Sequence, residues 1–168
     1  HVHPVTPLVA WVPVIAFLYW RAAATDLSSL QVAALSEFGF GVWTLTEYAL
    51  HRWVFHFQPR GPITQRLQFL IHGLHHDDPQ DPTRLVMPPV AAILLASILY
   101  GMFWAILGPI RVEPFFGAFL VGYLCYDYTH FSVHHFTPRT RVGRYLKQSH
   151  MLHHYAKSHS RWGVSSPL

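Results

Sequence analysis

Residues 30–56 read LQVAALSEFGFGVWTLTEYALHRWVFH, and this stretch decides the fold. Up to residue 50 it is apolar apart from Glu37, Glu47 and a few uncharged polar residues. It is long enough to cross the hydrocarbon core of a bilayer, which takes about 20 residues. The stretch then runs directly into His51 and His56. An apolar helix followed by paired histidines predicts a metal site at the end of a membrane helix.

Three further apolar runs accompany this one. We expect membrane helices at about residues 5–20, 30–50, 90–107 and 115–128. Only 12% of the 168 residues are charged, against about 25% in a typical soluble domain. A soluble helical core is the alternative, but four such runs leave too little polar surface to cover them. We therefore predict an all-α integral membrane protein that forms a single domain over residues 1–168.

The basic residues lie mainly in two histidine-rich segments, residues 51–89 and 129–168. These segments hold ten of the twelve Lys and Arg residues. Positive charge favours the cytoplasmic side of a membrane, so we expect both segments to form a cytosolic helical cap. The membrane would be a bacterial inner membrane or the endoplasmic reticulum. No Lys/Arg-rich block of the nucleic-acid-binding type is present, so we expect no nucleic-acid partner.

Several common chemistries are excluded by their missing motifs. The single cysteine, Cys125, cannot build an intramolecular disulfide framework or a four-cysteine zinc module. The chain also has no glycine-rich phosphate loop, GxSxG motif or internal repeat. Histidine, with 14 residues, outnumbers Lys and Arg together. The chemistry must therefore be sought among the histidines.

Ten histidines fall at spacings that suit metal ligands: His51, His56, His72, His75, His76, His130, His134, His150, His153 and His154. Positions i, i+3 and i+4 share one helix face, whereas adjacent positions diverge by about 100°. His75 and His76 can therefore reach different metals, as can His153 and His154. His51 and His56 are five apart and converge only if the helix ends or distorts between them. His135 diverges from His130 by about 140° and is the weakest candidate of its cluster.

Ten imidazoles suffice for two five-coordinate metal sites, each with one open position, which is the mark of a catalytic metal. All-imidazole ligation suits Fe, Zn, Cu or Ni and disfavours Mg or Ca. Isolated histidines are more often caps or hydrogen-bonding groups, so we leave out His1, His3 and His159. Metal-bound histidines usually donate their other N–H to a carboxylate or carbonyl. Glu47 and Asp127 lie one turn before His51 and His130, and we expect them to orient the ligands.

The HxxxxH, HxxHH and HxxHH boxes resemble those of the membrane fatty acid hydroxylase superfamily of non-haem di-metal oxygenases. Residues 72–89, HGLHHDDPQDPTRLVMPP, are similar to the signature of the fatty acid 2-hydroxylases. Residues 43–52, WTLTEYALHR, residues 122–127, GYLCYD, and residues 163–166, GVSS, fit the same family. The resemblance extends from about Trp11 to Ser166.

This resemblance implies a four-helix membrane base beneath a cytosolic pair of metals. It places His51, His56, His72, His76 and His154 on one metal, and His75, His130, His134, His150 and His153 on the other. The implied cofactors are two Fe, for which zinc can substitute during purification, with O2 as co-substrate. The implied reaction is hydroxylation at C2 of a fatty acyl chain, as a free acid, an acyl thioester or the N-acyl group of a sphingolipid.

The resemblance also implies partners. Many eukaryotic members carry a cytochrome-b-type haem domain, which this sequence lacks, so we expect an external cytochrome-b-type or ferredoxin-like electron donor with its reductase. The sequence also lacks the aromatic and acidic tail that usually follows the last box. Membrane lipids and the lipid acyl substrate are the other expected partners. Arg84 is the candidate for holding a substrate carboxylate or headgroup, and Tyr126 and Tyr155 are candidates for the substrate entrance. A sterol or carotenoid hydroxylase or desaturase, or a non-catalytic metal-binding membrane protein, are the alternatives.

Overall fold

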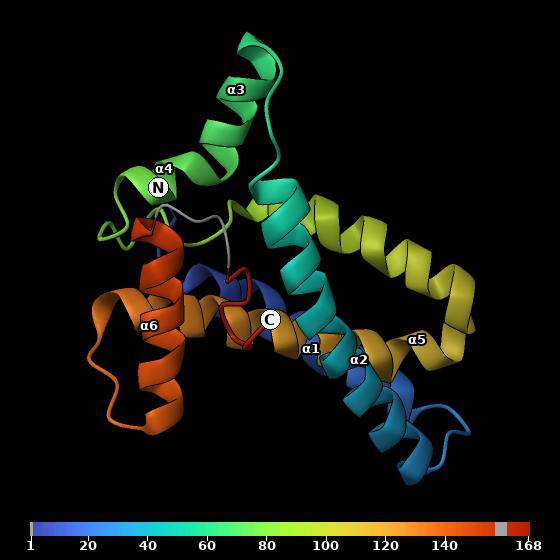
Figure 1. The fold of residues 1–168 in the computed structure, drawn as a ribbon. Helices are drawn as coiled ribbons and strands as arrows, with labels where there is room; N and C mark the ends of the chain where they lie inside the picture. Colours follow the sequence, from blue (N-terminus) through green and yellow to red (C-terminus); the bar gives the residue numbers. More distant parts are fainter. Residues whose placement is uncertain (1, 157–160) are drawn as a thin grey trace. The chain divides into compact units, whose positions relative to one another are not determined.

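The computed structural model describes residues 2–156 and 161–168, and within them every regular element is helical (Figure 1). The elements in chain order are α1 (Thr6–Ala23), α2 (Ser29–Ala49), the π-helix η1 (Leu50–Phe55), α3 (Pro62–Gln68), the π-helix η2 (Phe69–Gly73), α4 (Leu74–Asp77), α5 (Pro89–His135) and α6 (Arg141–Tyr155). The expected all-helical fold is confirmed for this part of the chain. The inferences about His1 and His159 lie outside the described residues.

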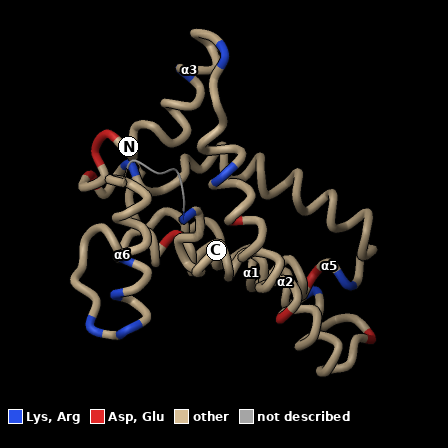
Figure 2. The backbone as a smooth tube through the Cα atoms, in the orientation of Figure 1, with Lys and Arg blue, Asp and Glu red and all other residues tan. Residues whose placement is uncertain are grey.

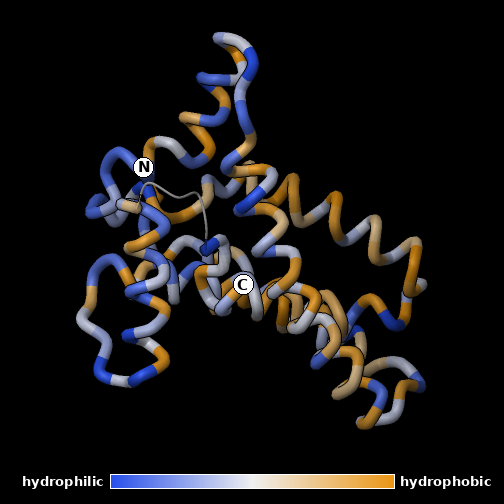
Figure 3. The backbone as a smooth tube through the Cα atoms, viewed as in Figure 1, coloured by the Kyte–Doolittle hydropathy of each residue, from blue (hydrophilic) through white to orange (hydrophobic). Residues whose placement is uncertain are grey.

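Two helices, α1 and α5, are long and apolar enough to cross a membrane. In the most apolar window of α5 only 6% of the residues are buried within the protein, and Val90 and Ile106 are 80% and 71% exposed. Figure 3 shows the first part of α5 as a largely hydrophobic helix. Apolar side chains that face outward along α1 and the first part of α5 indicate contact with lipid, so the chain is membrane-associated. Four membrane-spanning helices and a cytosolic cap stay predictions.

The two apolar runs expected at residues 90–107 and 115–128 are the two arms of α5, separated by a bend at Gly108. Gly108 has φ 78° and ψ 171°, a left-handed backbone conformation that favours glycine. Pro109 follows and has no backbone N–H to continue the helical hydrogen bonds. This Gly-Pro pair explains why one helical segment contains two apolar arms.

The residues form two compact units by their contacts, and one of them comprises residues 4–43 and 87–124. Its interior is aromatic: the ring of Trp43 lies 5.1 Å from that of Phe119 and 5.4 Å from that of Tyr123. A side chain at Gly39 would collide with the carbonyl of Phe115, and one at Gly122 would collide with the ring of Trp43. These two glycines therefore let α2 and α5 approach closely, as small residues do between membrane helices.

The other unit comprises residues 1–3, 44–86 and 125–168. It includes both π-helices, α3, α4, α6 and the last turns of α5. All ten candidate metal ligands belong to this unit, which therefore carries the candidate site.

Candidate metal centre

A π-helix brings together the two histidines of the first pair. His51 and His56 are five residues apart, which would separate them on a regular α-helix. In the structure, η1 covers Leu50–Phe55, and the N–H of His56 donates to the carbonyl of His51 over 3.2 Å. This i to i+5 hydrogen bond is the π-helical one, and it places the two side chains one above the other. Their ring centroids lie 5.0 Å apart. The helix thus distorts between the two residues, as their spacing requires.

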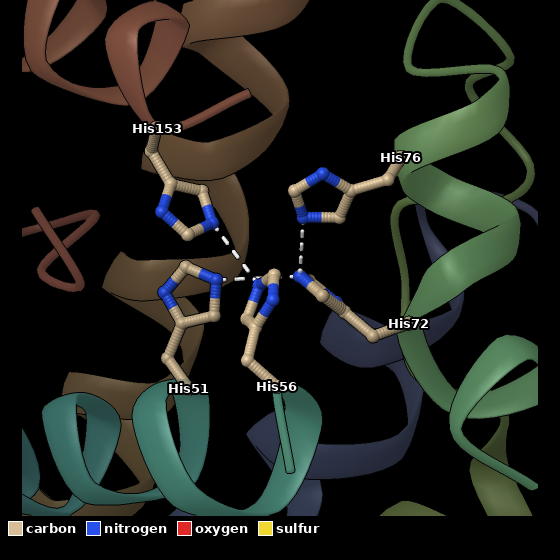
Figure 4. A group of neighbouring side chains, drawn as sticks. All are labelled: His51, His56, His72, His76 and His153. Atoms are coloured by element: carbon tan, nitrogen blue, oxygen red, sulfur yellow. Dashed lines mark hydrogen bonds between the residues drawn. The ribbon is translucent and has the colours of Figure 1, made fainter. Parts of the chain in front are cut away.

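Five histidines from three segments converge as group A: His51, His56, His72, His76 and His153. Their ligand nitrogens lie within 4.8 Å of one another. The Nε2 atom of His72 lies 3.2 Å from that of His51 and 3.1 Å from that of His76, and the Nε2 atoms of His56 and His153 are 3.1 Å apart. Figure 4 shows the rings pointing toward one another from η1, from the η2–α4 segment and from α6.

The remaining five histidines form group B: His75, His130, His134, His150 and His154. Their nitrogens also lie within 4.8 Å of one another. Nε2 of His150 lies 2.8 Å from that of His134 and 3.0 Å from that of His154. Nε2 of His75 lies 2.9 Å from that of His130 and 3.1 Å from that of His154. Group B takes its side chains from α4, the end of α5, and α6.

These distances fit metal ions better than they fit hydrogen bonds. Two nitrogens that bind one metal at about 2.1 Å and at right angles lie about 3.0 Å apart. The nearest Nε2 separations in both groups are 2.8 to 3.2 Å. A neutral imidazole has one N–H, so several Nε2 atoms that face one another cannot all be satisfied by mutual hydrogen bonds. Both donor sets therefore fit a metal ion that accepts several nitrogen lone pairs.

Burial keeps these imidazoles in the neutral form that a metal needs. The pKa of His51 is lowered to about 3, mainly by burial away from water and in addition by the neighbouring histidines. Burial likewise lowers the pKa of His75 to about 2, and it lowers the pKa values of His72 and His150 well below their usual range. At neutral pH these four histidines are thus uncharged.

The C-terminal segment contacts the histidines of group A. Nδ1 of His51 lies 2.5 Å from the carbonyl oxygen of Trp162, which must accept its hydrogen and so directs the Nε2 lone pair into group A. The Trp162 ring lies 5.9, 5.1 and 5.2 Å from the rings of His51, His56 and His153. We call residues 162–166 the C-terminal strap.

The side chain of Glu47 forms hydrogen bonds with this strap. The carboxylate is only 2% exposed. One of its oxygens, Oε1, accepts from the backbone N–H groups of Val164, over 2.6 Å, and Ser165, over 2.8 Å. The Ser165 hydroxyl donates to Oε2. Glu47 thus contacts the segment that holds His51. The sequence did not predict that Trp162, Val164 and Ser165 support group A, because nothing in their spacing shows that the C-terminal segment returns to η1.

The division of ligands between the two metals is wrong at one pair. The resemblance implies His154 in the first set and His153 in the second, but His153 lies in group A and His154 in group B. On α6, both i+3 and i+4 from His150 lie near its face, so the spacing alone allows either partner. The ring of His154 lies 4.6 Å from that of His150, whereas the ring of His153 lies 6.0 Å away. The predicted divergence of His75 from His76, and of His153 from His154, is confirmed.

The other predicted site residues lie in varied surroundings. His130 does not donate to Asp127, because its Nδ1 is buried without a hydrogen-bond partner among the described residues. Buried Tyr126 and exposed Tyr155 lie beside group B, with their rings 5.7 Å from His130 and 5.9 Å from His154. The Arg84 guanidinium instead pairs with Asp81 over 2.9 Å. His135 belongs to neither group and packs on Phe131.

Fold and site together define a helical, membrane-associated protein with a histidine-rich metal-binding cluster. The fatty acid hydroxylase family model matches residues 37–168, so the chain belongs to this family, as its motifs predict. It is 35% identical over 158 residues to the dihydroceramide fatty acyl 2-hydroxylase FAH2 of Arabidopsis thaliana, covering 94% of this chain and 67% of that relative. It is 38% identical over 161 residues to the ceramide very long chain fatty acid hydroxylase SCS7 of Saccharomyces cerevisiae, covering 94% of this chain and 41% of the yeast protein.

The fold also matches a solved structure. A structure of full-length scs7p in which only the hydroxylase domain is visible superposes with a TM-score of 0.91 at 37% identity, covering 98% of this chain and 63% of that one. The human fatty acid 2-hydroxylase is 33% identical over 181 residues, which cover 49% of its length. The chain therefore spans less than half of the yeast and human relatives.

Proposed function

We propose that this protein hydroxylates a fatty acyl chain at C2, as a free acid or as the N-acyl group of a sphingolipid. The observation that carries the proposal is the convergence of ten histidine side chains into two groups of five. The names of the relatives, which include fatty acid 2-hydroxylase and dihydroceramide fatty acyl 2-hydroxylase, support the position and the substrate class.

The proposed reaction needs a redox metal. A C–H bond at C2 is replaced by C–OH, one oxygen atom of O2 enters the product, and the other leaves as water after two electrons and two protons are taken up. Two iron ions held by groups A and B would supply the activation of O2, which zinc cannot because it has no redox chemistry. The two electrons would come from an external donor of the cytochrome-b or ferredoxin type with its reductase.

The side chains of the protein would bind the two metal ions and orient the ligands and the substrate. Groups A and B would each offer five nitrogens to one ion. The C-terminal strap would keep His51 in the tautomer that binds through Nε2, and Glu47 would keep the strap in place. Tyr126 and Tyr155, beside group B, are the side chains that we assign to the substrate entrance. Arg84, already paired with Asp81, would need to exchange that partner for a substrate carboxylate. We place the site on the cytoplasmic side of the membrane because the histidine-rich segments are basic.

Metal analysis and lipid analysis test this proposal together. The protein is expressed in an iron-supplemented host that makes no 2-hydroxy fatty acids, beside a His75→Ala/His76→Ala variant and a His135→Ala control. We expect about two irons per chain and 2-hydroxy acyl chains in the hydrolysed host lipids, both lost in the double variant and kept in the control. Oxygenated sterols or carotenoids in place of 2-hydroxy acids would support the alternative oxygenase. Bound metal without any oxygenated lipid would support a non-catalytic protein.

A further inference from the structure

An apolar stripe lies exposed along the helical segment that leads to the second histidine box. It consists of Ile63, Leu67, Leu70 and Ile71, on α3 and η2, and these side chains are 85%, 49%, 54% and 42% exposed. Ile63 and Leu67 are i and i+4 on α3 and share one face of that helix, and exposed Leu70 and Ile71 follow on η2. We call these four residues the α3 stripe. Four large apolar side chains exposed within nine residues are of the kind that marks an interaction site.

The opposite face of the same segment is the one that the protein uses internally. The Gln68 side-chain amide donates to the carbonyl of Phe55 over 3.3 Å, and His72 is buried in group A. The ring of His72 also stacks on that of Phe55 at 5.3 Å. These contacts fix the rotation of the segment about its own axis. The α3 stripe therefore faces away from group A.

The charges around the stripe are all positive. Between residues 48 and 76 the chain contains Arg52, Arg60 and Arg66 and neither Asp nor Glu. Figure 2 shows blue positions and no red ones along α3 and the loop that precedes it. Exposed Phe69 adds an aromatic side chain to the segment. Aliphatic and aromatic residues interleaved with arginines, without acids, are typical of helices that lie in the surface of an anionic bilayer.

We propose that the α3 stripe lies in the interface of an anionic bilayer, with Ile63, Leu67 and Leu70 in the headgroup–acyl boundary and Arg60 and Arg66 at the lipid phosphates. A bilayer is the occupant that these observations favour, because the chain already carries two helices able to cross one. Docking on lipid would secure the segment that carries His72, His75 and His76 at the membrane surface, whichever reaction the metal site performs.

The depth of two labelled positions tests this docking. In a Cys125→Ser background, the full chain carries one cysteine, either Leu67→Cys on the stripe or Gln65→Cys on the exposed side away from it. A fluorescent label is attached, and the protein is reconstituted in nanodiscs of phosphatidylcholine with phosphatidylglycerol. We expect the label at 67 to be quenched by headgroup-proximal brominated lipid at least about threefold more than the label at 65, and the label at 65 to react more with an aqueous quencher. Bound metal, measured in both proteins, reports that each is folded.

Two results would overturn the proposal. Equal aqueous quenching at 67 and 65 would place the stripe in water. Protection of 67 from both the aqueous and the lipid quencher would place it against protein, such as a second copy of this chain. The arginines are tested separately. We expect lipid quenching of the label at 67 to be stronger with phosphatidylglycerol than in pure phosphatidylcholine, and we expect the double variant Arg60→Gln/Arg66→Gln to lose this difference. An unchanged dependence on lipid charge would contradict the role of the arginines.

Discussion

Groups A and B contain the same number of histidines but are built differently. Group B takes two i, i+4 pairs, His130 with His134 and His150 with His154, from regular α-helices. Group A depends on the π-helices η1 and η2 and on a strap from the far end of the chain. Trp162 fixes His51 through Nδ1, whereas the Nδ1 atoms of all five group B histidines are buried without a hydrogen-bond partner among the described residues.

This difference separates two ways of positioning a ligand. In group B, helix geometry sets the two i, i+4 pairs locally, and His75 joins them from a distant segment without a strap behind it. Group A is fixed by a contact between residues more than a hundred positions apart, so its arrangement depends on the rest of the fold. Mutations that loosen the C-terminal strap should therefore disturb group A more than group B.

Removal of one ligand should have the largest effect. We expect His56→Ala in group A and His134→Ala in group B each to lower hydroxylation by at least about 100-fold, because each leaves an incomplete ligand set. Each should lower the iron content from about two to about one per chain, as measured by elemental analysis. His135→Ala, outside both groups, should keep both ions. Loss of both ions from either single variant would show that the groups are one cooperative site.

Loss of the Glu47 carboxylate should affect group A selectively. Glu47→Ala removes three hydrogen bonds to the C-terminal strap, and we expect about a 10- to 100-fold loss of activity, as for other residues that orient metal ligands. The iron content should fall toward one per chain. Glu47→Gln keeps an acceptor for the backbone N–H groups and should retain most of the metal. Equal loss of metal from both groups in Glu47→Ala would contradict a strap that serves group A alone.

The metal-free protein should lose stability in acid. The pKa values of His51 and His75 are lowered to about 3 and about 2, whereas an unfolded histidine titrates near 6.5. Below about pH 6.5 the unfolded chain therefore binds more protons than the folded one, and each such histidine removes up to about 1.4 kcal/mol per pH unit. The unfolding temperature in detergent should fall between pH 7.5 and 5.5. An unchanged midpoint would show that these histidines are not buried as neutral groups.

The smallest effect should come from the Trp162 ring. Trp162→Ala removes the ring contacts with His51, His56 and His153 but keeps the backbone carbonyl that accepts from His51. We expect about a 2- to 10-fold loss of activity, since aromatic contacts contribute about 0.5–1.5 kcal/mol. The steady-state rate at saturating substrate, compared with Glu47→Ala, measures the difference. A loss as large as that of Glu47→Ala would show that the ring, and not the carbonyl, holds group A.

The sequence by itself determined the long apolar helices and the candidate ligands. The apolar runs predict α1, α2 and the two arms of α5, and the exposed apolar side chains of α1 and the first part of α5 follow from the same runs. Helical periodicity sends His75 and His76 to different groups, because adjacent residues diverge by about 100°. It also requires a distortion between His51 and His56, which η1 provides. These are local consequences of backbone geometry.

Only the tertiary structure decided which histidines share a group and what holds them. His153 and His154 are both compatible with either group by spacing, and the position of α6 against η1 and α5 assigns His153 to group A and His154 to group B. The salt bridge of Arg84 with Asp81, the missing bond from His130 to Asp127 and the strap at Glu47 likewise depend on contacts that no periodicity encodes. Spacing along one helix fixes directions, but the meeting of distant segments is fixed by packing.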